Sequence, residues 1–110
     1  FMSKKNKISA SHILIMHKES QNTRSDLTSD EAKKKIDDIY KDIKSGKVQF
    51  ADAAVQYSNC PSGQSGGSLG EFTKGMMVKA FEDVAFSLDV EQISEPFESE
   101  FGFHIVKRDN

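Results

Sequence analysis

Cysteines, long apolar runs and an excess of one charge are all scarce in this chain, and each scarcity excludes a class of protein. No apolar run approaches the roughly 20 residues that a membrane span requires, and the polar, basic first residues do not resemble a signal peptide. The single cysteine, Cys60, cannot form an internal disulfide, so folding needs no oxidising compartment. We therefore expect a cytoplasmic location, with the nucleus as the alternative.

The charge balance argues against nucleic acid as the main partner. The 110 residues carry a formal net charge of −2, and 36% are hydrophobic and 29% charged, which is typical of a soluble globular protein and lacks a basic excess. The length fits one domain, without internal repeats or low-complexity linkers. The charge is uneven: residues 1–55 hold 11 Lys and Arg against 8 Asp and Glu, and residues 56–110 hold 4 against 9.

The first half of the chain predicts one strand and two helices. Residues 8–16 alternate as a strand with two fairly apolar faces, which indicates a central position in a sheet. After a polar loop, Thr28 and Glu31 form a capping box, and apolar residues recur at helical spacing until Gly46. A shorter helix is expected over residues 50–57.

The second half predicts a glycine-rich turn with a brief strand over residues 66–72, a third helix over 77–88, and closing strands over 93–99 and 103–108. Pro96 places the first closing strand at an edge or bulge. The element order is β-α-α-β-α-β-β, which predicts an α+β domain with helices around a small sheet.

Four segments in this order resemble the parvulin family of peptidyl-prolyl cis/trans isomerases. They are Ala10-Ser11-His12-Ile13-Leu14, residues 58–72 around Asn59-Cys60-Pro61, residues 75–82 with Gly75-Met76-Met77, and Phe101-Gly102-Phe103-His104-Ile105-Val106. The resemblance implies a parvulin-type domain over residues 8–110, with a four-stranded, mostly antiparallel sheet surrounded by helices. We expect residues 1–7 to form an N-terminal tail, and Phe1 before Met2 to be a remnant of expression cloning.

Three apolar residues match the proline pocket of parvulins, namely Leu69, Met77 and Phe81. Met77 and Phe81 are four apart, so on a helix they would share one face. That spacing by itself also fits ordinary core residues. The resemblance favours a slot that grips the proline ring.

Two histidines, His12 and His104, match the pair that parvulins place side by side on neighbouring central strands, where the rings hydrogen-bond to each other. The resemblance implies a shared network at the floor of the site, with Ser99 in place of the hydroxyl residue bonded to the pair. A lone histidine on an apolar strand would be a core residue instead. His17 has no match, and we expect it at the surface.

Cys60 occupies the position where parvulins carry Cys or Asp beside the X–Pro carbonyl, which implies a polar-contact role. A thiol nucleophile and a zinc ligand are the alternatives. Amide rotation needs no covalent step, however, and the sequence shows no CxxC or HxxxH spacing, so we expect neither metal nor cofactor. Flanking contacts are expected from four further residues: Asn59, Leu14, Phe101 and Met76.

Phospho-directed parvulins carry a lysine shortly after the first histidine and an arginine pair in the next loop. Here Met16 replaces the lysine and the arginine pair is absent, although Lys18 and Arg24 remain. Phosphate recognition favours a bidentate guanidinium. We therefore predict a preference for uncharged or apolar residues before proline.

The sequence thus predicts a peptidyl-prolyl isomerase that acts non-covalently on proline-containing segments of flexible or unfolded client proteins, either as a monomer or as a module of a longer chain. The alternatives are a non-catalytic peptide-binding or chaperone module on the same scaffold and, behind it, a cysteine-dependent hydrolase. The lysines of the first helix favour ordinary ion pairs over a membrane surface; they are Lys33, Lys34, Lys41 and Lys44.

Overall fold

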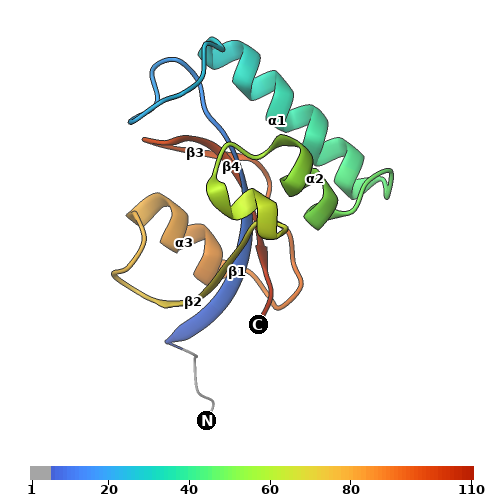
Figure 1. Ribbon diagram of the computed structural model, residues 1–110. Helices are drawn as coiled ribbons and strands as arrows, with labels where there is room; N and C mark the ends of the chain where they lie inside the picture. The colour runs from blue at the N-terminus through green and yellow to red at the C-terminus, as the bar shows by residue number, and fades with distance from the viewer. Residues whose placement is uncertain (1–5) are drawn as a thin grey trace.

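The computed structural model describes residues 6–110 and contains a four-stranded antiparallel sheet in the order β2-β1-β4-β3 (Figure 1). The strands are β1 (Lys7–Ile15), β2 (Ser68–Thr73), β3 (Phe97–Ser99) and β4 (Gly102–Arg108). β1 is central, pairing with β2 on one side and β4 on the other. The predicted α+β fold is confirmed. Of the predicted tail, residues 1–5 lie outside the described part of the chain, and Lys7 already belongs to β1.

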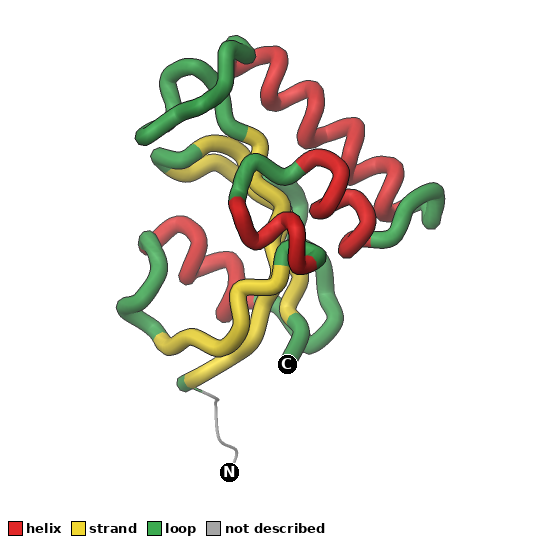
Figure 2. The backbone as a smooth tube through the Cα atoms, in the orientation of Figure 1, coloured by secondary structure: helices red, strands yellow, loops and turns green. Residues whose placement is uncertain are grey.

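Helices cover both faces of the sheet. α1 (Ser29–Lys44) and α2 (Phe50–Tyr57) lie on one side, and α3 (Lys79–Ser87) lies on the other, as the tube view in Figure 2 also shows. Side chains of a strand alternate between faces, and β1 follows this rule. Ile13 and Ile15 belong to the core under α1 and α2, whereas Ile8 and Ala10 belong to the core under α3.

α1 begins where the capping box predicted. The Thr28 hydroxyl accepts from the Glu31 N–H at 3.1 Å, and the Glu31 carboxylate accepts from the Thr28 N–H at 2.8 Å, so two otherwise unpaired donors are satisfied. Its solvent face carries the predicted i,i+4 ion pairs, Lys33–Asp37 at 3.1 Å and Lys34–Asp38 at 2.9 Å. Exposed pairs of this kind contribute little to stability, because water and salt screen them.

Between α2 and β2 the chain forms a short 3-10 helix, η1 (Pro61–Ser65), that the sequence analysis did not predict. It ends against β1, where the His12 N–H donates to the Gly67 carbonyl at 2.9 Å. Gly67 has φ +88°, and a Cβ built there would lie 2.4 Å from the His12 carbonyl oxygen. Only glycine permits both the backbone angle and the approach.

Two predicted elements are shorter than expected. The strand predicted over residues 93–99 is regular only at Phe97–Ser99, and Ile93 makes an isolated bridge to Lys107. Pro96 lies directly before β3, at the edge of the sheet as expected. The third helix begins at Lys79 rather than at residue 77. Within residues 6–110, no helix has both the length and the apolar character needed to cross a membrane.

Candidate active site

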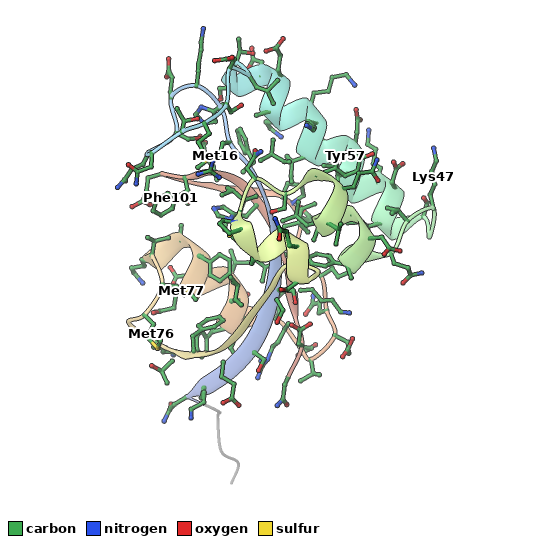
Figure 3. All side chains as sticks on the ribbon, in the orientation of Figure 1. Met16, Lys47, Tyr57, Met76, Met77 and Phe101 are labelled. Atoms are coloured by element: carbon green, nitrogen blue, oxygen red, sulfur yellow. The ribbon has the colours of Figure 1, made fainter. Side chains whose placement is uncertain are left out.

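A cavity of about 340 Å³ opens on the α3 side of the sheet. The connection from β2 to α3 forms one wall, and the turn between β3 and β4, which carries Phe101, lies across from Met77 (Figure 3). The lining is mostly apolar and comes from His12, Cys60, Leu69, Met76, Met77, Val78, Phe81, Phe101 and His104. Segments distant in sequence therefore converge on one hollow.

The register of β1 and β4 brings the two histidines together. Leu14 faces His104 across the ladder, and His12, two residues earlier on the same face of β1, is therefore diagonal to His104. The two Nδ1 atoms are 3.3 Å apart, and the ring planes differ by 23°. His12 is 7% exposed and His104 3%. The predicted side-by-side arrangement of the rings is present.

Aromatic rings enclose this pair. The Phe81 ring from α3 meets both imidazoles nearly edge-on, with centroids 5.5 Å from His12 and 5.8 Å from His104. The Phe97 ring from β3 stacks on His104 with centroids 5.2 Å apart and planes 17° apart. This contact leaves little room for water around the His104 ring.

A hydrogen-bond chain leads from the β3–β4 turn into the pair. The Phe101 N–H donates to Ser99 Oγ at 3.1 Å, and Ser99 Oγ lies 2.6 Å from His104 Nε2. If the hydroxyl donates to Nε2, the His104 proton is on Nδ1 and faces His12 Nδ1, so His12 carries its proton on Nε2. His12 Nε2 is buried, and no partner for it is found among the described residues.

Burial keeps both imidazoles neutral. It lowers the pKa of His12 from 6.5 to about 4. Burial, together with the repulsion that two protonated rings side by side would experience, lowers the pKa of His104 from 6.5 to about 3. Both shifts have the direction expected when a cation would be desolvated. Near pH 7 the floor of the cavity therefore consists of two uncharged rings.

Cys60 stands at the rim, on a segment bonded to β1. The Asn59 N–H donates to the Leu14 carbonyl at 2.7 Å, and Asn59 Oδ1 accepts from the Met16 N–H at 2.8 Å. These bonds give the C-terminal end of β1 a hydrogen-bonding partner where β2 no longer pairs with it. The Ser62 hydroxyl donates to Cys60 Sγ at 3.1 Å.

Met77 reaches the cavity by a route other than the predicted one. It lies two residues before α3, so the argument that Met77 and Phe81 share a helical face is wrong. The turn ahead of the helix instead packs Met77 against the core cluster that contains Phe81. Val78 is the N-cap of α3 and has no side-chain capping bond, so the sequence carried no signal for the helix start.

The cavity gathers most of the predicted site residues. Eight line it or contact its floor: His12, Cys60, His104, Ser99, Leu69, Met77, Phe81 and Phe101, with Met76 at its rim, 64% exposed. Leu14 and Asn59 lie outside the lining and support the strand. Val78 in the lining and Phe97 against His104 also belong to the site, although the sequence did not predict them. Phe97 pairs with His104 in the ladder between β3 and β4, so only a correct prediction of that strand register would have identified it.

His17 is not at the surface, and that prediction is wrong. It is 7% exposed, its ring lies 5.7 Å from the Phe103 ring, and its Nδ1 accepts from the Glu19 N–H at 3.2 Å. Its Nε2 lies 3.7 Å from a carboxylate oxygen of Glu98. The tight turn after β1 folds the ring back onto β4, which a polar sequence pattern does not reveal.

Within residues 6–110, no group of three or more His, Cys, Asp or Glu is placed to hold a metal ion. The donor atoms in the cavity are two imidazoles and one thiol, and His104 already uses Nε2 for Ser99. The cavity therefore provides an apolar recess in which the polar groups, two neutral imidazoles and one thiol, are held in fixed positions.

Residues 12–110 match the family model described as "Rotamase: PPIC-type PPIASE domain". The chain is 38% identical over 113 residues to the peptidyl-prolyl cis-trans isomerase Pin1 of Malus domestica, covering 94% of this chain and 93% of that protein. It is 44% identical to foldase protein PrsA 4 of Bacillus cereus, covering 94% of this chain and 31% of the foldase. The structure of the peptidyl-prolyl isomerase ESS1 of Candida albicans superimposes with a TM-score of 0.94 at 31% identity, covering 100% of this chain and 66% of that one.

The family model spans nearly the whole sheet and all three α-helices, and the apple protein has about the same length as this chain. The matches in sequence and in fold therefore cover the elements that line the cavity. The chain belongs to the parvulin family, the PPIC-type peptidyl-prolyl cis-trans isomerases.

Proposed function

We propose that residues 8–110 accelerate rotation about Xaa–Pro peptide bonds, and that the cavity on the α3 face is where the rotation occurs. The observation that carries this proposal is the combination of an apolar recess and two buried, neutral imidazoles at its floor. The names of relatives that cover nearly the whole chain support the activity. The substrates are proline-containing segments of flexible chains.

The reaction asks little of the protein chemically, because no bond breaks. Rotation crosses a barrier of about 18–20 kcal/mol that arises from the partial double bond of the amide, and uncatalysed exchange takes tens to hundreds of seconds. In the twisted amide, resonance is lost and the carbonyl oxygen carries less negative charge. A recess of low polarity disfavours the planar amide more than the twisted one, which lowers the barrier.

The proposed roles follow from position. Leu69, Met77 and Phe81 hold the proline ring, since they supply apolar wall next to the imidazoles. His12 and His104 fix the floor, and Ser99 sets the tautomer of the pair through His104 Nε2. His12 Nε2 is buried and has no hydrogen-bond partner among the described residues, so a substrate would meet the pair through its ring surfaces.

Cys60 is proposed as a polar contact rather than a nucleophile. Its one side-chain partner in the described chain is the Ser62 hydroxyl, whereas an activated thiol needs a base in contact. The imidazoles lie on the cavity floor and bond to each other. The thiol would contact the substrate carbonyl at the cavity rim without forming a bond to it.

Substrate preference is proposed to exclude phosphate. Met16 is 4% exposed and apolar, so the position that carries a lysine in phospho-directed relatives gives no cation here. The Arg24 guanidinium donates to the Asn59 carbonyl. We predict uncharged residues before proline, a monomer or one module of a longer protein, and a cytoplasmic or nuclear location; the bacterial foldase among the relatives shows that longer proteins also carry this domain.

A protease-free isomerisation assay tests the activity with peptides that place Leu, Ala, Lys, Glu or phosphoserine before proline. We expect acceleration that is greatest for Leu and weakest for phosphoserine. Leu69→Ala should raise KM, because it removes wall from the recess, whereas Val90→Ala removes an exposed side chain outside the lining and should have no effect. Binding without acceleration would leave the non-catalytic module, and a preference for phosphoserine would overturn the substrate proposal.

A further inference from the structure

We propose that Glu82 is a positioning residue of the proline pocket, which it shapes by holding the β2–α3 connector (residues 74–78) against α3. The proposal rests on the proposed function, because it concerns how the same recess receives proline. Met76, Met77 and Val78, a third of the lining residues, all belong to this connector. Whatever fixes the connector therefore fixes one wall of the pocket.

The central contact is one hydrogen bond. The Gly75 N–H donates to Glu82 Oε1 at 2.7 Å, and a carboxylate acceptor makes such a bond stronger than a neutral one. Gly75 has φ +93°, so the connector turns sharply at the residue that Glu82 holds. Met76 and Met77 follow directly.

Two contacts besides this bond hold the end of the connector: the Glu82 N–H donates to the Val78 carbonyl at 2.9 Å, and Met77 and Val78 pack against the core cluster of Phe81. The remaining polar contacts of the connector, around Gly75 and Met76, are weaker. The Thr73 and Met76 backbones are joined at 3.3 Å, and the Thr73 N–H contacts Met76 Sδ at 3.3 Å, both within the turn itself. The Lys74 ammonium lies 5.4 Å from the Phe86 ring centroid. Among the described contacts, the Glu82 carboxylate is thus the charged group of α3 that ties the connector to the helix.

The location of Glu82 makes this tie relevant to binding. Its neighbour Phe81 is 3% exposed and lines the recess beside the connector, in contact with both histidines. Glu82 therefore sets the distance between the wall made by the connector and the wall made by Phe81. A recess that grips a ring depends on that distance.

The effect should be local. Gly75 is exposed and Glu82 is only half-buried, so water can replace the lost acceptor without leaving a buried donor. Asp83, the next residue, supplies a matched control. It is an exposed acid on the same helix, and its hydrogen bonds and ion pair within the described residues go to Lys79, at 3.1 Å, rather than to the connector. Both residues carry the same charge, so electrostatic effects on the α3 N-terminus are shared.

The experiment compares Glu82→Ala, Glu82→Gln and Asp83→Ala with the parent chain. For Glu82→Ala we expect KM for a Leu-Pro peptide to rise about fivefold while kcat changes less than about twofold, because binding and rotation lose the same wall contact. Glu82→Gln keeps an acceptor and should stay within about twofold of the parent. Asp83→Ala should match the parent. Water exchange of the Gly75 amide, measured by NMR, should accelerate in Glu82→Ala alone.

An unchanged KM together with an unchanged Gly75 amide in Glu82→Ala would overturn the proposal, as would equal effects of the Ala and Gln variants, which would indicate charge rather than a hydrogen bond. The two readouts separate the proposals. If the parent chain fails to accelerate isomerisation, the proposed function fails, while the Gly75 amide still reports whether Glu82 holds the connector.

Discussion

Acid should destabilise this domain steeply, because the folded state keeps two histidines neutral. Folding lowers the pKa of His12 from 6.5 to about 4 and that of His104 to about 3. A group with a lowered folded pKa binds a proton more readily in the unfolded chain. The folded state therefore loses stability as the pH falls from 6.5 toward the folded pKa values, and it gains none from these groups above pH 7.

The magnitude follows from the shifts. Each pKa unit corresponds to about 1.4 kcal/mol. Because of His12 alone, the free energy of unfolding should therefore fall by roughly 3 kcal/mol between pH 7 and pH 4. With both imidazoles resisting protonation, the limiting slope between pH 5.5 and 4.5 is about 2.7 kcal/mol per pH unit. Domains of this size are stable by roughly 5–15 kcal/mol, so much of that reserve is lost before pH 4.

Urea unfolding followed at half-unit steps from pH 7.5 to 4.5 measures this slope, and NMR titration of the imidazole signals assigns it. His104→Gln removes one titrating ring and should flatten the slope by about half. Activity should be constant from pH 6 to 8, because neither ring changes charge there. A stability that is flat or rising as the pH falls from 6.5 to 4.5, or a folded pKa above 6 for either ring, would refute the reasoning.

Three substitutions, two of them with a control variant, test other parts of the site. Gly67→Ala should cost at least about 3 kcal/mol by urea unfolding, since its Cβ meets a β1 carbonyl, whereas Gly70→Ala meets no atom and should cost about 1 kcal/mol from its positive φ alone; equal losses would argue against the close approach. Ser99→Ala should cost about 1–3 kcal/mol by leaving His104 Nε2 unpaired, and Ser99→Thr should restore it. Cys60→Ala should lower kcat/KM roughly ten- to a hundredfold, and loss to the uncatalysed rate would indicate a covalent role.

Elements with local signals were predictable from the sequence. The Thr28–Glu31 capping box indicates the start of α1, and apolar residues on both faces indicate β1. Both signals can be read from the sequence because capping bonds and side-chain alternation depend only on neighbouring residues. The four parvulin-like segments placed both histidines correctly. The contact between the two rings depends on the register of β1 and β4.

Elements that depend on tertiary contacts were not predictable. Phe97 and His104 are seven residues apart and meet only because a tight turn folds β3 onto β4. His17 reads as a polar loop residue, and its burial depends on Phe103 from the far end of the chain. Nothing within a few residues of either position encodes these contacts, so no periodicity could reveal them.

The cavity itself is a consequence of unequal helix coverage. In the part of the chain that the structure describes, one face of the sheet is covered by α1, with 16 residues, and α2, with eight, whereas the other face is covered by α3 alone, with nine. β1 carries apolar residues on both faces, so the face under the short α3 must remain partly uncovered or be closed by loops. The connector before α3 and the turn at Phe101 enclose the remainder without filling it. The recess for proline therefore follows from a short third helix, and the loops that border it, rather than the sheet, control its width.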